Sequence, residues 1–291
     1  MIKKQKVWLI GASGFTGEYL VSALNKKGYS VDQSTVDITD LQQVDTAMQQ
    51  IQPNYIINLA AISFVPDGEN ESIYAVNTFG PQNILTACLN LSERPKKIIL
   101  VSSANVYGIQ EIEQLDEEAQ PNPVNHYGCS KWSMEQIAKT YSDRLDITVT
   151  RPFNYTGHGQ HVKFLVPKIV EHFKSKADVI KLGNIDVWRD FSDVRWVAAV
   201  YAELLTAPKQ DDLTVINVCS GRLLSIRNII ETLQRLTQHT IRVETDQEFV
   251  RNADIKKQCG NNKELFKMLP NLPEPIEFKQ TLQWMSQEIT A

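Results

Sequence analysis

Short runs of apolar residues alternate with helical patterns along the first half of the chain. The runs are typical of buried strands and cover Val7–Ile10, Ser30–Asp32, Thr35–Val36, Tyr55–Leu59, Ile98–Ser102 and Ile147–Thr150. Apolar residues at helical spacing predict helices near Thr16–Lys27, Leu41–Ile51, Ile73–Leu91 and Tyr127–Arg144. Because strands that alternate with helices usually pair in parallel, the pattern predicts a doubly wound α/β fold with helices on both faces of one sheet.

The pattern changes after Arg151 and Pro152. The next segment, from Asn154 to Gln160, is polar and contains glycine, which predicts a loop. Beyond it, the sequence predicts helices near Phe164–Lys176, Ser225–Leu236 and Ile276–Ile289, a short turn and helix over Phe191–Leu205, and a strand at Thr214–Val218. We expect residues 1–153 to form the larger domain, with segments returning to it from about 185–220, and residues 154–291 mainly to form a smaller α/β lobe.

Length and composition are ordinary for a globular protein and exclude few classes. The 291 residues can bury a sizeable core in one large domain or two closely joined ones. A net charge of −4 without a long basic stripe argues against general nucleic-acid binding. No apolar run reaches the roughly 20 residues that span a bilayer, so we expect no membrane partner.

The cysteines and the first residues favour a cytoplasmic location. Cys88, Cys129, Cys219 and Cys259 are far apart and form no C-x-x-C pair, so they predict neither a metal site nor a redox pair. Reduced thiols of this kind are typical of cytoplasmic proteins. The apolar run Val7–Ile10 follows lysines but is too short for the core of a signal peptide.

A glycine-rich loop follows the first apolar run directly. It reads Gly11-Ala12-Ser13-Gly14-Phe15-Thr16-Gly17 and opens a helical pattern. Glycines let the backbone turn sharply and approach a pyrophosphate, and the N-terminus of the following helix faces the anion. The spacing is G-x-x-G-x-x-G, and its strand-to-helix context predicts a dinucleotide-binding loop.

Tyr127 and Lys131 lie four residues apart, on one face of a predicted helix. A free phenol has a pKa of about 10 and transfers protons poorly at neutral pH. We expect the Lys131 ammonium to lower the pKa of Tyr127, so that the pair can carry a proton to or from a carbonyl oxygen. Ser103 follows a predicted strand and is placed to donate a hydrogen bond to a substrate oxygen, although a serine at a strand end can also simply cap a turn.

Together these elements resemble the extended branch of the short-chain dehydrogenase/reductase superfamily, the NAD-dependent epimerase/dehydratase family, over nearly the whole chain. The resemblance implies a Rossmann-type domain in residues 1–153, a nucleotide-sugar-binding lobe in residues 154–291, and a catalytic triad of Ser103, Tyr127 and Lys131. The residues that it places on the cofactor are Gly11, Ser13, Gly14, Phe15, Thr16, Gly17, Asp37, Ile38, Leu59, Ala60, Ala61, Asn77, Tyr127, Lys131 and Pro152.

The choice between NADH and NADPH rests on one position. An acidic residue about 20 residues past the glycine loop favours NAD, because it can bond the ribose 2′-hydroxyl. Asp32 lies near that position and no arginine is close. Asp32 therefore favours NADH over NADPH. Because this single position does not decide between them, the predicted cofactor is written NAD(P)H.

Strings in the second half resemble enzymes that act on GDP-mannose derivatives, namely the 4,6-dehydratase and 4-keto-6-deoxymannose reductase group. The strings are residues 151–160, 182–194, 217–221 and 251–254, with His158 and Asn252 where that group usually has proline. The resemblance implies that the substrate is a GDP-sugar. The residues that it places on this substrate are Ser63, Asn154, Lys168, Arg189, Arg251 and Asp254.

The residues after Ser103 bear on the reaction. Dehydratases of this branch carry an acidic pair or a glutamate there, whereas this chain has Ala104 and Asn105, which cannot act as bases. The resemblance therefore implies reduction of GDP-4-keto-6-deoxy-D-mannose to GDP-D-rhamnose. Open alternatives are a nucleotide-sugar 4-epimerase, a 4-reductase that gives the other C4 epimer or acts on a deoxyheptose, and a non-catalytic dinucleotide-sensing protein.

Two predicted helices, Ile73–Leu91 and Tyr127–Arg144, are candidates for a subunit interface. Both carry apolar residues at helical spacing. Members of the superfamily often dimerise through the equivalent helices. We therefore expect a homodimer.

Overall fold

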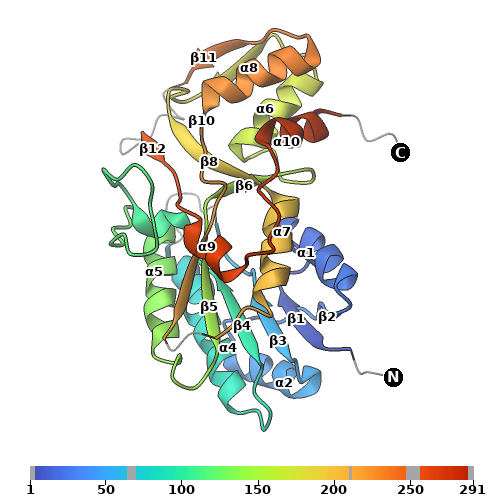
Figure 1. Cartoon of the computed structure of the whole chain (residues 1–291), viewed down its shortest axis with the longest axis vertical. Helices are drawn as coiled ribbons and strands as arrows, with labels where there is room; N and C mark the ends of the chain where they lie inside the picture. The colour runs from blue at the N-terminus through green and yellow to red at the C-terminus, as the bar shows by residue number, and fades with distance from the viewer. Residues whose placement is uncertain (1–3, 64–69, 210–211, 247–255, 288–291) are drawn as a thin grey trace.

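The larger part of the molecule is built on one parallel β-sheet. The computed structural model describes residues 4–63, 70–209, 212–246 and 256–287. In spatial order the strands are β2 (Ser30–Asp32), β1 (Lys6–Ile10), β3 (Tyr55–Asn58), β4 (Lys97–Val101), β5 (Ile147–Pro152) and β9 (Thr214–Val218). Every neighbouring pair runs parallel. Figure 1 shows this sheet in the lower half of the molecule.

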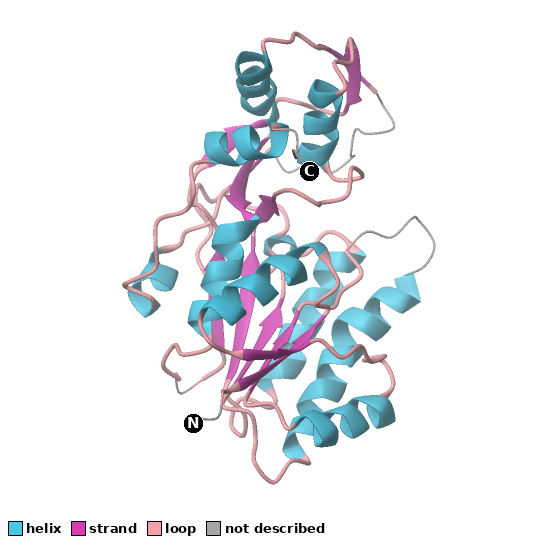
Figure 2. Ribbon diagram, turned by 90° about the vertical axis from the view of Figure 1, so that its right-hand side faces the viewer, coloured by secondary structure: helices cyan, strands magenta, loops and turns pink. Residues whose placement is uncertain are grey.

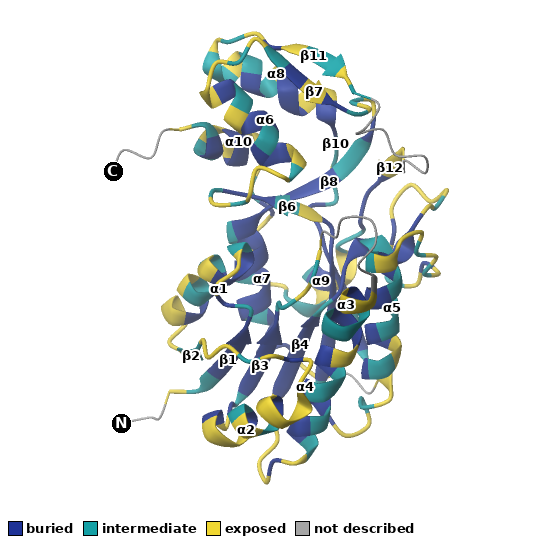
Figure 3. Cartoon of the chain, turned by 180° about the vertical axis from the view of Figure 1, so that it is seen from behind, coloured by how far each residue is buried: buried dark blue, intermediate teal, exposed yellow. Residues whose placement is uncertain are grey.

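Alternation of side chains along each strand explains why helices cover both faces of the sheet (Figure 2). Val7 and Leu9 pack into one apolar cluster, whereas Trp8 and Ile10 pack into another. The covering helices are α1 (Phe15–Lys26) and α7 (Val194–Leu204) on the first face, and α2 (Leu41–Ile51), α4 (Gly80–Leu89) and α5 (His126–Lys139) on the second. Each fully buried aliphatic side chain stabilises the fold by roughly 1.5–3 kcal/mol, and the inner strands β1, β3, β4 and β5 are buried nearly throughout (Figure 3).

The smaller lobe collects most of the remaining elements. Its central strand β8 (Trp188–Asp193) pairs with β6 (Asn154–Thr156), β10 (Leu223–Ser225) and β12 (Lys257–Gln258), and β7 (Val179–Leu182) pairs with β11 (Arg242–Thr245). Helices α6 (Leu165–Lys174), α8 (Ile226–Thr237) and α10 (Phe278–Ser286) share one apolar core with β8. The short helix α9 (Lys263–Met268) lies against β9. The predicted fold class, a doubly wound parallel sheet with a smaller α/β lobe, is confirmed.

Three predicted elements differ in the structure. Residues 35–36 form no strand, because side chains hold the chain in a turn after β2: Ser34 N donates to Asp32 Oδ1 at 3.0 Å, and Trp8 Nε1 donates to Ser34 O at 3.2 Å. The segment predicted as a loop from Asn154 begins with β6, and the turn predicted from Phe191 lies within β8. The strand β6 has only three residues, and both strands pair with each other and with distant segments, so local periodicity does not reveal them.

The predicted helix Ile73–Leu91 is a composite. It consists of α3 (Asn70–Tyr74), a π-helical segment (Ala75–Phe79) and α4. Gly80 begins α4 beneath Ile38, where an added Cβ would lie 2.5 Å from Ile38 Cδ1. The inserted π-turn is the kind of irregularity that often accompanies functional sites in helices.

None of the helices in the described residues is both long and apolar enough to span a membrane.

Candidate active site

The glycine loop meets the end of β3 at the point where the strand order reverses. Gly11 adopts φ +82°, and an added Cβ would lie 2.9 Å from Ala60 N and 3.2 Å from Leu59 C. The loops after β1 and β3 are therefore in direct contact. In open α/β sheets ligands bind beyond the carboxyl ends of the strands at such a switch point.

Helix α1 begins in the glycine loop, and its first turn packs tightly against the backbone of that loop. An added Cβ at Gly17 would lie 2.3 Å from Ala12 O, so only glycine permits this approach. The N-cap is Gly14, which has no side chain to accept hydrogen bonds from the first-turn amides. Those N–H groups and the helix dipole are suited to an anion, which is the chemistry a dinucleotide pyrophosphate needs.

Two side chains of the loop contact the strand β6. Thr16 Oγ1 and Tyr155 Oη lie 2.9 Å apart, and the rings of Phe15 and Tyr155 are stacked at 6.3 Å. Ser13 is exposed. The loop is thereby braced by the segment that leads from the sheet into the smaller lobe.

Two predicted cofactor-binding residues, Asp32 and Asp37, accept hydrogen bonds within local turns of the chain. Asp32, at the end of β2, accepts a hydrogen bond from Ser34 N. Asp37 accepts hydrogen bonds from the hydroxyl and the backbone N–H of Thr39, which lower the pKa of its carboxyl group. Ile38 next to it is buried.

Asn77 holds the loop after β3 rather than facing solvent. It is fully buried. Its Oδ1 accepts from Ile62 N at 2.8 Å, and its Nδ2 donates to Ile62 O at 3.0 Å and to Ser130 Oγ at 3.1 Å. It therefore ties the residues that follow Leu59, Ala60 and Ala61 to helix α5. Pro152 is buried at the end of β5, paired with Val218.

The structure brings the three catalytic candidates together at the carboxyl end of β4. Ser103 lies two residues beyond the strand and is 6% exposed. Tyr127 lies in the first turn of α5, and the Ser103 side chain is close enough to lower the pKa of its phenol. Lys131 lies one turn further along α5 and donates from Nζ to Val101 O at 2.7 Å. Elements that are distant in sequence thus form one compact group.

The pKa values of the pair differ from the sequence-based prediction. Burial raises the pKa of Tyr127 to about 12, opposed by the hydrogen bond from Ser103. Burial lowers the pKa of Lys131 to about 8, opposed by the charge of Glu135. The prediction that Lys131 acidifies Tyr127 is wrong for this structure, because burial of the phenol outweighs other influences. Tyr127 is therefore held in its protonated form, which suits a proton donor.

A buried ion pair lies behind this group. Arg151 donates to Glu135 from Nη2 at 2.6 Å and from Nε at 3.1 Å, and both side chains are almost fully buried. Ser102 Oγ also donates to Glu135. Arg151 Nη1 donates to Tyr107 Oη, which in turn donates to Asn217 Oδ1 at 2.7 Å. The network joins β5, β9, α5 and the residue that follows β4, and Glu135 brings its charge close to Lys131.

Three of the predicted substrate residues, Asn154, Lys168 and Arg189, lie in the smaller lobe. Asn154, on β6, donates from Nδ2 to Asp190 O at 3.1 Å, and Arg189, on β8, donates from Nη1 to Trp188 O at 2.9 Å. Lys168, on α6, donates to Lys181 O at 2.8 Å. Ser63 is exposed in the segment after β3. The structure places Asn154 and Arg189 on paired strands, while Arg251 and Asp254 lie outside the described residues.

Sequence reasoning missed the role of Asp190. Its fully buried carboxylate accepts from Ser220 N, Ser220 Oγ, Gly221 N and Gly260 N, at 2.7–3.3 Å. It thereby fixes the chain after β9 and after β12 next to Arg189. Burial raises its pKa, and these hydrogen bonds oppose the rise. The one sequence feature that could have indicated this role is the position of Asp190 within residues 182–194, the segment that resembles the GDP-mannose enzymes.

Tyr155 and Lys257 make structural contacts that the sequence did not predict. Tyr155 is buried enough that its pKa is raised, with the hydrogen bond to Thr16 opposing. Lys257 lies beside Trp188 in the β12–β8 pairing, with its Nζ 5.6 Å from the indole centroid. Neither position carries a pattern that sequence reasoning could have read.

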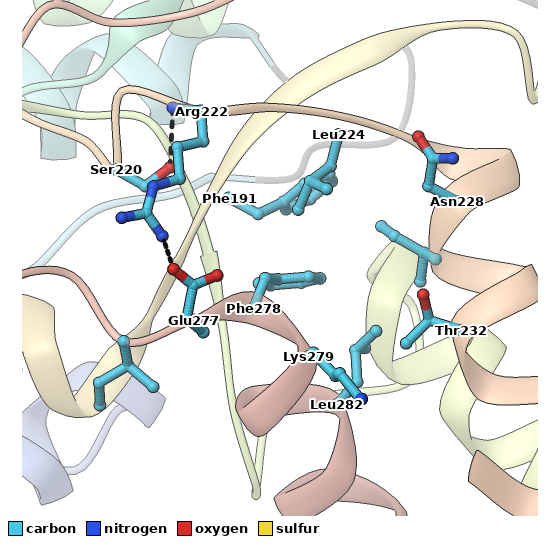
Figure 4. Close-up of a pocket in the computed structure, with 12 residues that line it drawn as sticks. Phe191, Ser220, Arg222, Leu224, Asn228, Thr232, Glu277, Phe278, Lys279 and Leu282 are labelled. Carbon is cyan, nitrogen blue, oxygen red and sulfur yellow. Dashed lines mark hydrogen bonds and ion pairs between the residues drawn. The ribbon is translucent and has the colours of Figure 1, made fainter. Parts of the chain in front are cut away.

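A pocket of about 160 Å³ lies elsewhere, in the smaller lobe (Figure 4). Phe191 and Phe278 stack in its wall, and Arg222 pairs with Glu277 beside it. Its lining residues, all in the described part of the chain, include none of the three catalytic candidates.

Comparisons with known proteins agree with this geometry. The model of the NAD dependent epimerase/dehydratase family matches residues 7–219. The chain is 36% identical over 272 residues to GDP-6-deoxy-D-talose 4-dehydrogenase of Aggregatibacter actinomycetemcomitans, covering 91% of this chain and 92% of that protein. It is 28% identical over 294 residues to GDP-6-deoxy-D-mannose reductase of Pseudomonas aeruginosa, covering 96% of this chain and 95% of that protein. The structure of RMD from Pseudomonas aeruginosa complexed with NADPH matches with a TM-score of 0.87 at 27% identity, over 97% of this chain and 96% of that chain.

Proposed function

The chain belongs to the NAD-dependent epimerase/dehydratase family, and on that premise we propose that it is an oxidoreductase that uses NAD(P)H to reduce the C4 ketone of a GDP-4-keto-6-deoxy sugar. The observation that carries the proposal is the group of Ser103, Tyr127 and Lys131 at the carboxyl end of β4, next to an asparagine that cannot act as a base. The names of two relatives that cover nearly the whole chain support the substrate class.

The proposed product is GDP-D-rhamnose, formed from GDP-4-keto-6-deoxy-D-mannose. A second candidate is the C4 epimer of that product, because the relative at 36% identity is named for GDP-6-deoxy-D-talose. The two outcomes differ only in the face of the ketone that receives the hydride.

The residues of the glycine loop fit the proposed cofactor. Gly11 and Gly17 keep the backbone free of side-chain atoms where an added Cβ would collide, and Gly14 leaves the first turn of α1 open to a pyrophosphate. When bound, NAD(P)H supplies the hydride for the ketone carbon. We propose residues 1–153, with segments returning from about 185–220, as the cofactor-binding domain, and residues 154–291 as mainly the nucleotide-sugar-binding lobe.

Tyr127 is the proposed proton donor. With a pKa of about 12 its phenol is protonated at any physiological pH, so it can give its proton to the oxygen of the reduced C4 as negative charge develops there. Ser103 donates a hydrogen bond that stabilises the same charge, or the phenolate that remains. Lys131, on the same face of α5, is proposed to hold the ribose hydroxyls of the bound cofactor through its ammonium group.

Arginine and lysine of the smaller lobe are proposed to hold the GDP-sugar. The guanidinium of Arg189 is a planar fork suited to diphosphate oxygens, and Lys168 adds a point charge. Asn154 lies on the strand paired with that of Arg189. Arg251, Asp254 and Ser63 complete the proposed set of contacts.

The proposal is tested by incubating the protein with NADH or NADPH and freshly made GDP-4-keto-6-deoxymannose. Reduction consumes one cofactor per sugar, and NMR of the product assigns its C4 configuration. A 4-epimerase would interconvert nucleotide sugars without net consumption of NAD(P)H, and a dinucleotide sensor would bind cofactor without turnover. Either result would replace the proposed function.

The pH dependence of kcat/KM follows from Lys131. This parameter reports ionisations of the free enzyme, in which the pKa of Lys131 is about 8. As pH rises through about 8 the ammonium loses its proton and its charge, so kcat/KM is expected to fall about tenfold per pH unit. Tyr127, with a pKa of about 12, stays protonated over the same range. A profile that stays flat to pH 10 would contradict the assignment of Lys131.

Gly17→Ala tests the cofactor loop. The added Cβ would lie 2.3 Å from Ala12 O, a backbone atom, so the loop must shift. We expect the affinity for NAD(P)H, measured by fluorescence titration, to fall at least about a hundredfold, because the pyrophosphate depends on close backbone approach. Gly28→Ala is the matched control: its φ is +85°, yet no atom lies within 4 Å of the added Cβ. That variant should bind the cofactor normally, and equal affinity in both variants would contradict the loop's role.

A homodimer formed through α4 and α5 is proposed for the assembly, and the cytoplasm for the location. Phe79 is 55% exposed at the start of α4, which is unusual for a large aromatic side chain. Light scattering should give twice the mass of one chain, and Phe79→Glu should shift it to a single chain. A single-chain mass for the unmodified protein would refute the dimer.

A further inference from the structure

The hydroxyl of Ser103 accepts two hydrogen bonds from the same neighbour. Asn105 donates to Ser103 Oγ from its backbone N at 3.2 Å and from its side-chain Nδ2 at 3.0 Å. A serine hydroxyl has two lone pairs and one hydrogen. Because both lone pairs face donors, the one role left to the Ser103 hydroxyl is to donate its own hydrogen.

The Tyr127 phenol oxygen can accept this hydrogen. The Ser103 side chain lowers the pKa of Tyr127, which is the effect of a hydrogen bond donated to the phenol oxygen, and Ser103 has only its hydrogen to offer because both of its lone pairs face Asn105. Tyr127 then keeps its own hydrogen for a ligand. The amide, the hydroxyl and the phenol therefore form a chain in which every hydrogen bond points from Asn105 towards the substrate.

Backbone packing fixes the two ends of this chain relative to each other. Asn105 lies in the 3₁₀ helix Ala104–Tyr107, and the first turn of α5 sits directly on it: a Cβ added at Gly128 would lie 2.7 Å from Asn105 O. Gly108 N donates to the same carbonyl oxygen at 3.3 Å. Gln258, from β12, donates to Ala104 O at 3.2 Å. Asn105 and Tyr127 are thereby held in one rigid arrangement.

We propose that Asn105 is a positioning residue that sets the direction of the hydrogen bonds at the catalytic group, keeping the Ser103 hydroxyl a donor. This inference rests on the proposed ketone reduction, in which the C4 oxygen gains negative charge and needs donors only. No bond to Asn105 forms or breaks: the hydride goes to C4, the proton of Tyr127 goes to the C4 oxygen, and Asn105 keeps its protons.

The chemistry of the side chain makes the inference specific to asparagine. A carboxylate at the same position has nearly the same shape but only accepts hydrogen bonds. It would take the hydrogen of Ser103, and Tyr127 would then donate to Ser103 rather than to the substrate. Asn105→Asp thus reverses the chain without opening a cavity, whereas Asn105→Ala removes one donor and leaves the backbone donor in place.

The test is a double-mutant cycle on the reduction of GDP-4-keto-6-deoxymannose. Asn105→Asp is expected to lower kcat about a hundredfold, the effect of losing one donor to a developing oxyanion, with KM and NAD(P)H affinity within about threefold of the wild type. Asn105→Ala should lower kcat less. In a Ser103→Ala background, Asn105→Asp should add less than about twofold, because its effect passes through the hydroxyl that is already absent.

Controls separate this inference from the proposed function. Asn25→Asp adds the same charge at an exposed position of α1 and should leave kcat unchanged. A wild-type protein that fails to reduce the keto-sugar contradicts the proposed function. An active wild type in which Asn105→Asp costs as much with Ser103→Ala as without it, or leaves kcat within about twofold, overturns the role of Asn105. Thermal unfolding of each variant verifies that the comparison is made between folded proteins.

Discussion

Replacing Tyr127 with phenylalanine is expected to lower kcat about a thousandfold while cofactor binding is retained. The change removes one oxygen and the proton that it carries, and positioned proton transfer typically contributes 10²–10⁴-fold in rate. The ring remains in the first turn of α5, so the packing around Ser103 and Lys131 is preserved. Water reaches the C4 oxygen as a poor substitute, because it is neither positioned nor part of the hydrogen-bond chain.

Steady-state kinetics with the keto-sugar and fluorescence titration with NAD(P)H measure the two parts of this expectation. Tyr155→Phe is the matched control, since it also removes a buried phenol oxygen close to the site, but one that is bonded to Thr16. It should change kcat only a fewfold. A Tyr127→Phe variant with kcat within tenfold of the wild type would contradict the role of Tyr127 as proton donor.

The second large effect concerns stability. Glu135→Leu leaves the Arg151 guanidinium buried without its partner, since the two side chains are 1% and 3% exposed. The pKa of Arg151 is raised above its usual value by Glu135, so the group stays charged. Removing one member of a buried ion pair typically costs about 3–5 kcal/mol of the free energy of unfolding, because the other charge stays desolvated.

Urea unfolding of three variants tests this prediction. Glu135→Leu should lose most stability, whereas the double variant Glu135→Leu/Arg151→Met should recover much of it, because apolar residues of similar volume replace a buried pair at little cost. Tyr107 and Ser102 also lose partners in these variants, so full recovery is not expected. Equal stability of Glu135→Leu and the double variant would show that the charge of Arg151 is not the cause.

Local pattern explains which parts of the fold were predictable. The strands Lys6–Ile10 and Tyr55–Asn58 are buried on both faces, so they read as unbroken apolar runs, and the glycines at 11, 14 and 17 mark the turn into α1. The helix Leu41–Ile51 was predicted with its observed bounds. Asp40 caps its first turn, and the helix ends where Gln52 adopts a left-handed conformation. In each case one stretch of sequence determines one element.

Long-range pairing explains what was not predictable. The strands around β8 pair segments as far apart in sequence as Trp188 and Lys257, and Asp190 acts through the backbone of Ser220, Gly221 and Gly260. The pKa of Tyr127 depends on burial by the whole fold, which spacing within α5 cannot convey. The catalytic candidates were found because their types and order are distinctive, whereas the residues that orient them carry no such signal.

The transfer of deuterium from labelled NAD(P)H shows whether this protein delivers a hydride to C4 of the keto-sugar. With cofactor that carries deuterium at its hydride position and GDP-4-keto-6-deoxymannose, we expect one deuterium at C4 of the product sugar for each cofactor oxidised. A product without deuterium at C4, or a keto-sugar that remains unreduced in the presence of saturating NADH and NADPH, would refute the proposed reduction.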